Sequence, residues 1–369
     1  MNGQGHRMFV DELTRFAAGH ADPRVTAIAE RTAEPLRVVV RGRRGAGRST
    51  VARALQAAGE RAATGPATFS ETPAARPVGS GAELIVHVVA EVIKPEDADA
   101  IAAARQPVLA VLSKADLVGS LSGRTGDGPT AAARARCADL AALAGVPVEP
   151  MIGLLAVAAL DGLDDGLWAA LRVLADGPGH ADLFDQSCDG FLAADVAVPA
   201  DVRLRLLDAL GLFGAALAVA ALRQGRTEAQ IRVLLRRMSR VDAVLGGLSA
   251  VGAEVRYRRV LDAVAELEAL AVGDERISGF LTRDNTVVAR MAAAVDVAEA
   301  AGLEVGPVSA EGADADAAAH LPRAVRWQRY SLGPVSDLHR ACGADIARGS
   351  LRLWSRACGS LPEQSGKAW

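Results

Sequence analysis

The residues best suited to hold a phosphate group lie in one short segment, Gly42-Arg43-Arg44-Gly45-Ala46-Gly47-Arg48-Ser49-Thr50. Its spacing, Gly-x4-Gly followed by a basic residue and a serine, is that of a P-loop, with Arg48 in the lysine position. An apolar run at 36–41 precedes the segment and an Ala- and Leu-rich stretch follows it. A strand, a glycine-rich turn and a helix N-terminus together attract anions, because unpaired N–H groups and the helix dipole point at the ligand. The candidate phosphate contacts are Gly42, Gly45, Gly47, Arg48, Ser49 and Thr50, with Ser49 also the candidate metal ligand.

The arginine in the lysine position has two explanations. Among 41 basic residues the only lysines are Lys94, Lys114 and Lys367, so arginine is the default cation of this chain. A guanidinium is nevertheless planar and larger than the compact lysine ammonium. We therefore expect the loop to bind phosphate loosely or in a shifted position. The alternative is a strand-turn-helix unit whose glycines serve close packing alone.

A second candidate site follows the apolar run at 107–112. There, Ser113-Lys114-Ala115-Asp116 resembles the [Asn/Thr]-Lys-x-Asp guanine-specificity motif of regulatory GTPases. An aspartate can accept two N–H groups of guanine, and a lysine stem can cover the base. Lys114 and Asp116 are therefore candidate nucleotide contacts, although Ser113 replaces the usual Asn or Thr. The alternative is a solvated loop in which Asp116 caps a turn.

The segment that carries the hydrolytic groups in a GTPase is shortened in this chain. A working GTPase carries an Asp-x-x-Gly that reaches the magnesium ion and the terminal phosphate, but no aspartate lies between Asp22 and Asp97. The apolar run at 83–89 predicts the strand that normally follows this motif. Residues 61–82 before it are rich in Pro, Gly, Ala and Thr, which predicts a loop. Thr64, Thr68 or Thr72 could offer a hydroxyl to a metal ion, and no residue is assigned a catalytic role.

Taken in order, these motifs resemble those of the actinobacterial dynamin-like GTPases, most closely the isoniazid-inducible type. The matching segments are 33–37, the glycine-rich loop, 113–116, 153–156, 206–214 and 334–340 with Trp327. The resemblance implies a GTPase head that binds GTP or GDP with Mg²⁺, a helical neck or trunk, membrane association and assembly with itself or with a related protein. The chain departs from the family at Arg48, Ser113, at Ile152 (where a serine is usual) and in the shortened segment 61–82.

Composition is typical of a globular protein with two domains. The chain has 369 residues, half of them apolar, and a net charge of −3, which gives no general attraction to nucleic acid or to an anionic membrane. The four cysteines are widely spaced and indicate reduced thiols rather than a metal site. Met1 to Arg7 lacks the pattern of a signal peptide, so we expect a cytoplasmic protein.

The pattern of apolar residues predicts a mixed fold, an α/β head joined to an all-α part. Residues 36–176 should form a P-loop NTPase-like domain on a reduced parallel sheet, with strands near 36–41, 83–89, 107–112 and 147–152. Residues 1–35 should form helices that pack on a helical bundle at 177–369. The longest apolar run, 209–222, is shorter than a membrane span, so we expect a buried helix, with membrane insertion as the alternative.

Two further side chains and the neighbouring arginines have structural interpretations. His87 lies inside an apolar strand, so it should be a core histidine with a polar partner. Ser336 should cap the last helix. Arg41, Arg43 and Arg44 could hold phosphates or an acidic partner, although a solvated basic edge is favoured for the first two.

Three functions are compatible with the sequence. The favoured one is a degenerate dynamin-like protein, a pseudo-GTPase, that binds guanine nucleotide with weak or no hydrolysis and assembles with an active dynamin-like GTPase at the inner face of the cell membrane. The second is an active GTPase with an unconventional site, and the third is a nucleotide-independent helical scaffold.

Overall fold

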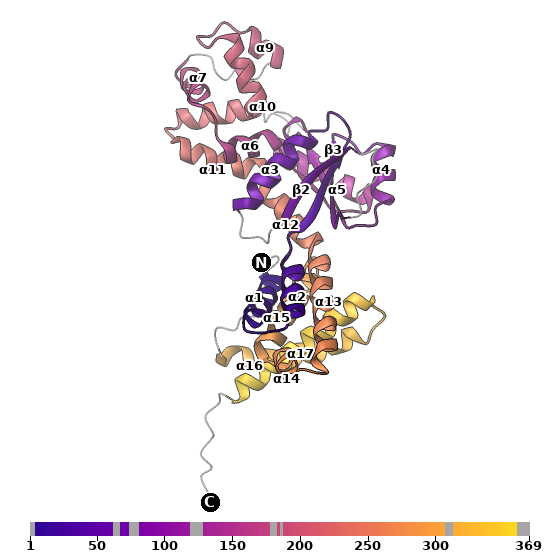
Figure 1. The fold of residues 1–369 in the computed structure, drawn as a ribbon. Helices are drawn as coiled ribbons and strands as arrows, with labels where there is room; N and C mark the ends of the chain where they lie inside the picture. The colour runs from indigo at the N-terminus through magenta and orange to yellow at the C-terminus, as the bar shows by residue number, and fades with distance from the viewer. Residues whose placement is uncertain are drawn as a thin grey trace, which may run out of the picture. The chain divides into compact units, whose positions relative to one another are not determined.

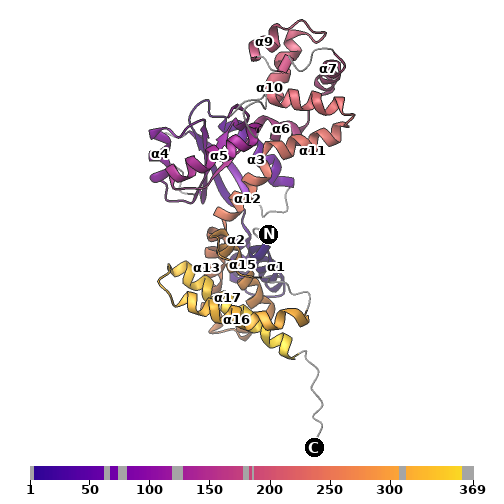
Figure 2. The same ribbon diagram turned by 180° about the vertical axis from the view of Figure 1, so that it is seen from behind.

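The chain folds into two compact units. The computed structural model describes residues 4–61, 67–73, 81–118, 128–177, 183–184, 187–306 and 313–359. Unit 1 combines Met1–Pro35 with Ser249–Trp369, and unit 2 is Leu36–Leu248 (Figures 1 and 2). The second unit therefore extends past residue 176, where the sequence led us to end the head. The reason is that the helices after residue 177 bury their apolar faces against helices before it.

Unit 2 is built on a five-stranded sheet in the order β2-β1-β3-β4-β5, and every pair of neighbours is parallel. Its strands are β1 Leu36–Gly42, β2 Ala67–Pro73, β3 Leu84–Ala90, β4 Val108–Ser113 and β5 Val148–Pro150. β3 and β4 are buried almost throughout, which explains their continuous apolar sequences. The four strands expected from the sequence are confirmed, with ends shifted by one or two residues.

The strand β2 corrects the prediction that 61–82 is a loop. It pairs along its whole length with β1, from Leu36 opposite Ala67 to Gly42 opposite Pro73. Its sequence, Ala-Thr-Phe-Ser-Glu-Thr-Pro, has only one large apolar residue. Because β2 is an edge strand with a neighbour on one side only, it needs little apolar surface and gives no hydrophobic run.

Helices cover both faces of the sheet. The helical segments of this part of the chain are α3 Arg48–Arg61, α4 Pro95–Ala102, η1 Ala115–Leu117, α5 Gly128–Ala144, α6 Gly153–Asp161, α7 Asp165–Asp176, α9 Cys188–Ala193, α10 Ala200–Arg223, α11 Glu228–Ser239 and α12 Val241–Val251, whose last three residues belong to unit 1. Figures 1 and 2 show α3 and α6 on one side of the sheet, and α4 and α5 on the other. The helices α7, α9, α10 and α11 gather beside α6 around a core that includes Trp168, Phe191 and Leu206.

The apolar run at 209–222 lies in α10, which is interrupted. Gly211 has φ 65° and ψ 174°, so the helix consists of two pieces joined at this residue. Leu206, Leu210 and Val219 are buried in unit 2. By length and composition alone, α10 passes the test for a membrane-spanning helix, a test that core helices of other proteins also pass.

Unit 1 is all-helical. Its helices are α1 Gln4–Ala18, α2 Pro23–Ala33, α13 Ala253–Ala271, α14 Glu275–Thr282, α15 Asp284–Ala300, α16 Ala313–Ser331 and α17 Asp337–Gly359. Phe9 and Leu13 of α1 share one core with Tyr257 and Trp327. The Tyr257 hydroxyl donates to the buried Asp345 carboxylate over 2.9 Å. As predicted, the hydroxyl of Ser336 caps α17 by accepting from the N–H of His339.

Candidate functional site

The glycine-rich loop at 43–47 joins β1 to α3 at the carboxyl edge of the sheet. Gly45 and Gly47 have φ angles of 84° and 79°, in the left-handed region that glycine adopts most easily. At Gly42, a Cβ atom would lie 2.6 Å from the carbonyl oxygen of Val88, so β1 and β3 can approach only because this residue has no side chain. β1 is also where the strand order reverses, and ligands of parallel α/β sheets bind at such points.

Two side chains hold the loop in place from other elements. Ser113, at the end of β4, places its hydroxyl 2.5 Å from the carbonyl oxygen of Ala46. The Nε of Arg43 donates to Oδ2 of Asp97 in α4 over 2.9 Å. Ser113 and Asp97 are both buried. The serine that replaces the usual Asn or Thr therefore ties the second sequence motif to the first.

Asp97 is the centre of a buried polar network. Its carboxylate accepts hydrogen bonds from Arg43, from the backbone N–H of Lys94, and from His87, whose Nε2 is 3.1 Å away. Burial alone would raise the pKa of Asp97, but these donors hold it below its ordinary value. Burial lowers the pKa of His87. His87 is thus a core histidine with a polar partner, as predicted.

The same network corrects the expectation of a solvated basic edge. Arg41 is 7% exposed, and Arg43 forms its ion pair with a fully buried carboxylate. Arg44 is exposed. The sequence pattern shows four arginines near the loop, but it cannot show that an aspartate more than fifty residues away neutralises one of them.

A cavity of about 450 Å³ opens beside the loop, a volume within the range of small-molecule sites. It brings together four residues predicted from the sequence, Gly47, Thr50, Lys114 and Asp116. Apolar side chains complete much of its wall: Leu117, Ile152, Leu154, Leu212 and Phe213. The parallel sheet explains this convergence, since the segments after β1, β4 and β5 leave the same edge.

Four other predicted residues do not line this cavity. Gly42 ends β1, Gly45 lies in the loop, and Arg48 and Ser49 begin α3 and contact Glu71 of β2. The arrangement therefore has an apolar cavity with one carboxylate and, next to it, a glycine-rich loop that ends at the N-terminus of α3. Such a pair of sites suits a ligand with a flat ring at one end and an anion at the other.

Asp116 has the properties of a recognition group. Burial raises the pKa of its carboxyl, and the charge of Lys114 offsets only part of that effect. Lys114 itself is exposed and has φ 51°, a left-handed conformation that is uncommon for a residue with a side chain. A carboxylate kept in an apolar cavity can accept two N–H groups of one ring edge, as guanine would offer them.

The helix α10 contributes wall residues that the sequence did not point to. Its break at Gly211 faces the cavity, and a Cβ atom there would lie 3.7 Å from Oδ2 of Asp116. Ser187 and Cys188, at the start of α9, also line the hollow. The available signal was a glycine inside an otherwise apolar helical run, because such a glycine often marks a break or a close approach.

Glu71, in β2, is the functional candidate that sequence reasoning missed. Its Oε2 accepts a hydrogen bond from the Ser49 hydroxyl over 2.8 Å and one from Nε of Arg48 over 3.3 Å. No aspartate lies between residues 22 and 97, and this strand supplies a glutamate instead. The sequence offered one signal for this residue. Glu71 follows a short run that contains Thr68 and Phe69, and it is followed by Thr-Pro.

A metal ion fits this place only in part. Ser49 and Glu71 are two oxygen donors that Mg²⁺ accepts, but Arg48 already neutralises the carboxylate. Within the residues that the structure describes, no group of three His, Cys, Asp or Glu side chains could hold a metal. Of the threonines considered, Thr68 and Thr72 lie in β2, and Thr64 falls outside the described residues.

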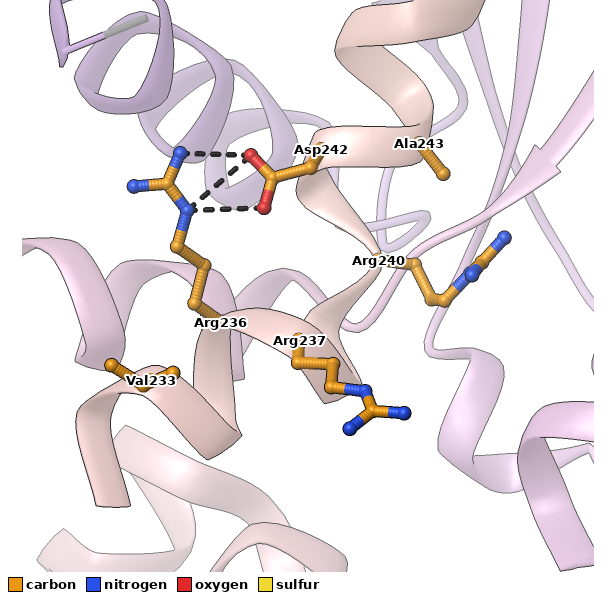
Figure 3. A pocket seen from close by; sticks show the side chains of 6 residues that line it. All are labelled: Val233, Arg236, Arg237, Arg240, Asp242 and Ala243. Atoms are coloured by element: carbon orange, nitrogen blue, oxygen red, sulfur yellow. Dashed lines mark hydrogen bonds and ion pairs between the residues drawn. The ribbon is translucent and has the colours of Figure 1, made fainter. Parts of the chain in front are cut away.

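A second hollow, of about 280 Å³, lies at the junction of α11 and α12 (Figure 3). Arg236 points across it to Asp242, with Nη2 2.8 Å from Oδ1, while Arg237 and Arg240 point away from that pair. Arg236 and Arg237 lie in the last turn of α11, where the helix dipole favours cations. This hollow therefore has a structural explanation in the connection between the two helices.

The end of α11 also supports the cavity wall. The carbonyl oxygen of Ser239 accepts a hydrogen bond from the N–H of Ile152 over 3.0 Å. At Gly153, the next residue, a Cβ atom would lie 3.0 Å from the Thr50 side chain. The start of α6 is thus held between α11 and the first turn of α3.

No protein-family model matches the chain, and a search of curated proteins found no match.

The half-buried carboxyl of Asp116 should reduce stability at neutral pH. Because its folded-state pKa is raised, ionisation as the pH rises above about 3.8 costs the folded protein more than the unfolded chain. We expect Asp116→Asn to increase the free energy of unfolding by about 0.5–2 kcal/mol at pH 7. This gain in the free energy of unfolding should shrink as the pH falls, because the Asp116 carboxyl then becomes neutral, as the asparagine already is. Urea unfolding followed by circular dichroism between pH 4 and pH 8 measures it.

The matched control for this substitution is Asp99→Asn, at an exposed position of α4. It should leave the urea midpoint unchanged. A loss of stability in Asp116→Asn at pH 7 would contradict the prediction and would mean that the carboxylate stabilises the fold.

Proposed function

We propose that this protein is a degenerate dynamin-like GTP-binding protein with a P-loop NTPase-like head. In this proposal it hydrolyses nucleotide weakly or not at all and acts as an assembly partner of an active dynamin-like GTPase. The site of action is the cytoplasmic face of the cell membrane, with peripheral rather than integral attachment. Its ligands are guanine nucleotides, with Mg²⁺ as the candidate metal and no role for nucleic acid.

The observation that carries the proposal is the cavity shared by Gly47, Thr50, Lys114 and Asp116. These residues come from two motifs more than sixty positions apart, and each motif by itself indicates a part of the same ligand, the phosphates or the base. The glycine-rich loop supports phosphate binding, since it ends at the N-terminus of the 14-residue helix α3. The apolar walls support the binding of a flat ring. Asp116 supports guanine rather than another purine as that ring.

Weak or absent hydrolysis is supported by the residues around Ser49. Arg48 and Ser49 both engage Glu71, so the groups that a P-loop directs to the terminal phosphate and metal are held by a side chain of the protein. An active GTPase with an unconventional site and a nucleotide-independent scaffold are the alternatives that the following measurements distinguish.

Nucleotide binding tests the site directly. A fluorescent guanine nucleotide should bind the purified protein weakly, and Asp116→Ala should reduce the affinity by about 1.5–3 kcal/mol, because a charged acceptor is lost. Arg48→Lys should strengthen binding, since the smaller ammonium fits under the phosphates. Asp99→Ala, at the exposed α4 position, is the control and should bind as the wild type does. Equal signals from all four proteins would overturn the guanine site.

Hydrolysis separates a pseudo-GTPase from an active enzyme. Phosphate release from GTP by the wild-type protein should not exceed that of Asp116→Ala, because the chain has no aspartate between residues 22 and 97 to reach the magnesium ion as in working GTPases. A colorimetric phosphate assay over several hours measures this. Release well above that of the variant would favour the active-enzyme alternative.

Assembly is tested by sedimentation with liposomes of anionic phospholipid. The net charge of −3 gives the chain no electrostatic attraction to such a surface, so it should sediment only when an active dynamin-like GTPase is also present. The partner alone and the chain alone are the controls. If the chain remains in the supernatant with the partner bound to lipid, the assembly role is wrong.

A further inference from the structure

The ion pair between Arg48 and Glu71 has a consequence for the kind of nucleotide that the loop can accept. Glu71 extends from β2, where it is paired with Val40 of β1, to the first turn of α3. There its Oε2 lies 3.3 Å from Nε of Arg48 and 2.8 Å from the hydroxyl of Ser49. The other end of the Arg48 guanidinium lies 3.5 Å from the carbonyl oxygen of Gly42. Arg48 thus spans the base of the loop from one strand to the next.

This arrangement puts a cation of the protein where a metal ion would be needed. In a P-loop, the residue at position 48 reaches the outer phosphates and the hydroxyl at position 49 binds Mg²⁺. Here the carboxylate beside Ser49 already has a guanidinium as its counter-ion. A divalent ion would have to approach that guanidinium, and the two positive charges would repel each other at short range. The described residues supply no cluster of further carboxylates to offset this repulsion.

The same ion pair also withholds the cation that a third phosphate would need. Two phosphates can be held by the loop N–H groups and the N-terminus of α3, which need no metal. A third phosphate would extend toward position 48, where a P-loop offers it an uncompensated cation and a metal ion. Here Glu71 already compensates the charge of Arg48, so neither group is available to offset the additional negative charge.

We propose that the loop selects a guanosine diphosphate over a triphosphate and binds it without a divalent metal, because the Arg48–Glu71 ion pair replaces the metal ion. This inference rests on the proposed guanine-nucleotide function and specifies the ligand of the same site, with the ion pair in place of the candidate Mg²⁺. It also accounts for the weak or absent hydrolysis in that proposal, since the diphosphate has no γ-phosphate to release.

The test uses the full chain and two fluorescent probes, a labelled GDP and a labelled non-hydrolysable GTP analogue, each titrated with Mg²⁺ and with EDTA. The dissociation constant for GDP should be unchanged by EDTA. The GTP analogue should bind at least about tenfold more weakly than GDP, equivalent to 1.4 kcal/mol. Tighter binding of the GTP analogue, or loss of GDP binding in EDTA, would overturn the inference.

A variant without the charge at position 71 tests whether Glu71 causes the preference for the diphosphate. Glu71→Gln keeps a similar size and should bring the affinity for the GTP analogue close to that for GDP. The matched control is Glu60→Gln, an exposed residue at the far end of α3 whose carboxylate contacts Gln56. It should leave both affinities as in the wild type. An unchanged preference in Glu71→Gln would also overturn the inference.

The outcomes distinguish the two proposals. Equal or tighter binding of the GTP analogue, sensitive to Asp116→Ala, would leave the guanine site standing and remove the diphosphate selectivity. Absence of binding by both probes, in Mg²⁺ and in EDTA, would remove both.

Discussion

The parallel pairing of β1 with β2 on one side and β3 on the other is the constraint from which the candidate site follows. It brings the carboxyl ends of the strands to one edge, so the glycine-rich loop, the Ser113–Asp116 segment and the start of α6 converge there. It also sets Glu71 one strand away from the loop, within reach of Ser49. The close β1–β3 contact requires a residue without a side chain at Gly42.

Two carboxylates of unit 2, the fully buried Asp97 and the half-buried Asp116, have opposite electrostatic environments. Asp97 accepts hydrogen bonds from three donors, its pKa is lowered, and it anchors the loop through Arg43. Asp116 lies in an apolar cavity and its pKa is raised. A carboxylate whose charge is poorly compensated inside the protein is what a ligand with N–H groups can stabilise, so perturbed groups of this kind cluster at functional sites.

Edge strands and long-range ion pairs mark the limit of sequence reasoning here. The buried strands β1, β3 and β4 can be recognised in the sequence as apolar runs. The glycine spacing predicts the turn after β1. β2 has no such run, because an edge strand is held mainly by backbone hydrogen bonds to its one neighbour, and any sequence can make these. Glu71 was missed together with the strand that carries it. The pairing of Arg43 with Asp97 was missed because a charge pattern carries no information about distant partners.

The sequence by itself determined the local elements of the site: the glycine-rich turn, the Ser-Lys-Ala-Asp segment, the buried strands before each, and the helical character of both ends of the chain. These depend on residue type, spacing and periodicity, which act over a few positions. Only the tertiary structure decided that Lys114 and Asp116 share a cavity with Gly47, that Gly211 of α10 closes it, and that Glu71 engages Arg48. Those relations depend on strand order and on close packing between segments far apart in the chain, and no local pattern specifies them.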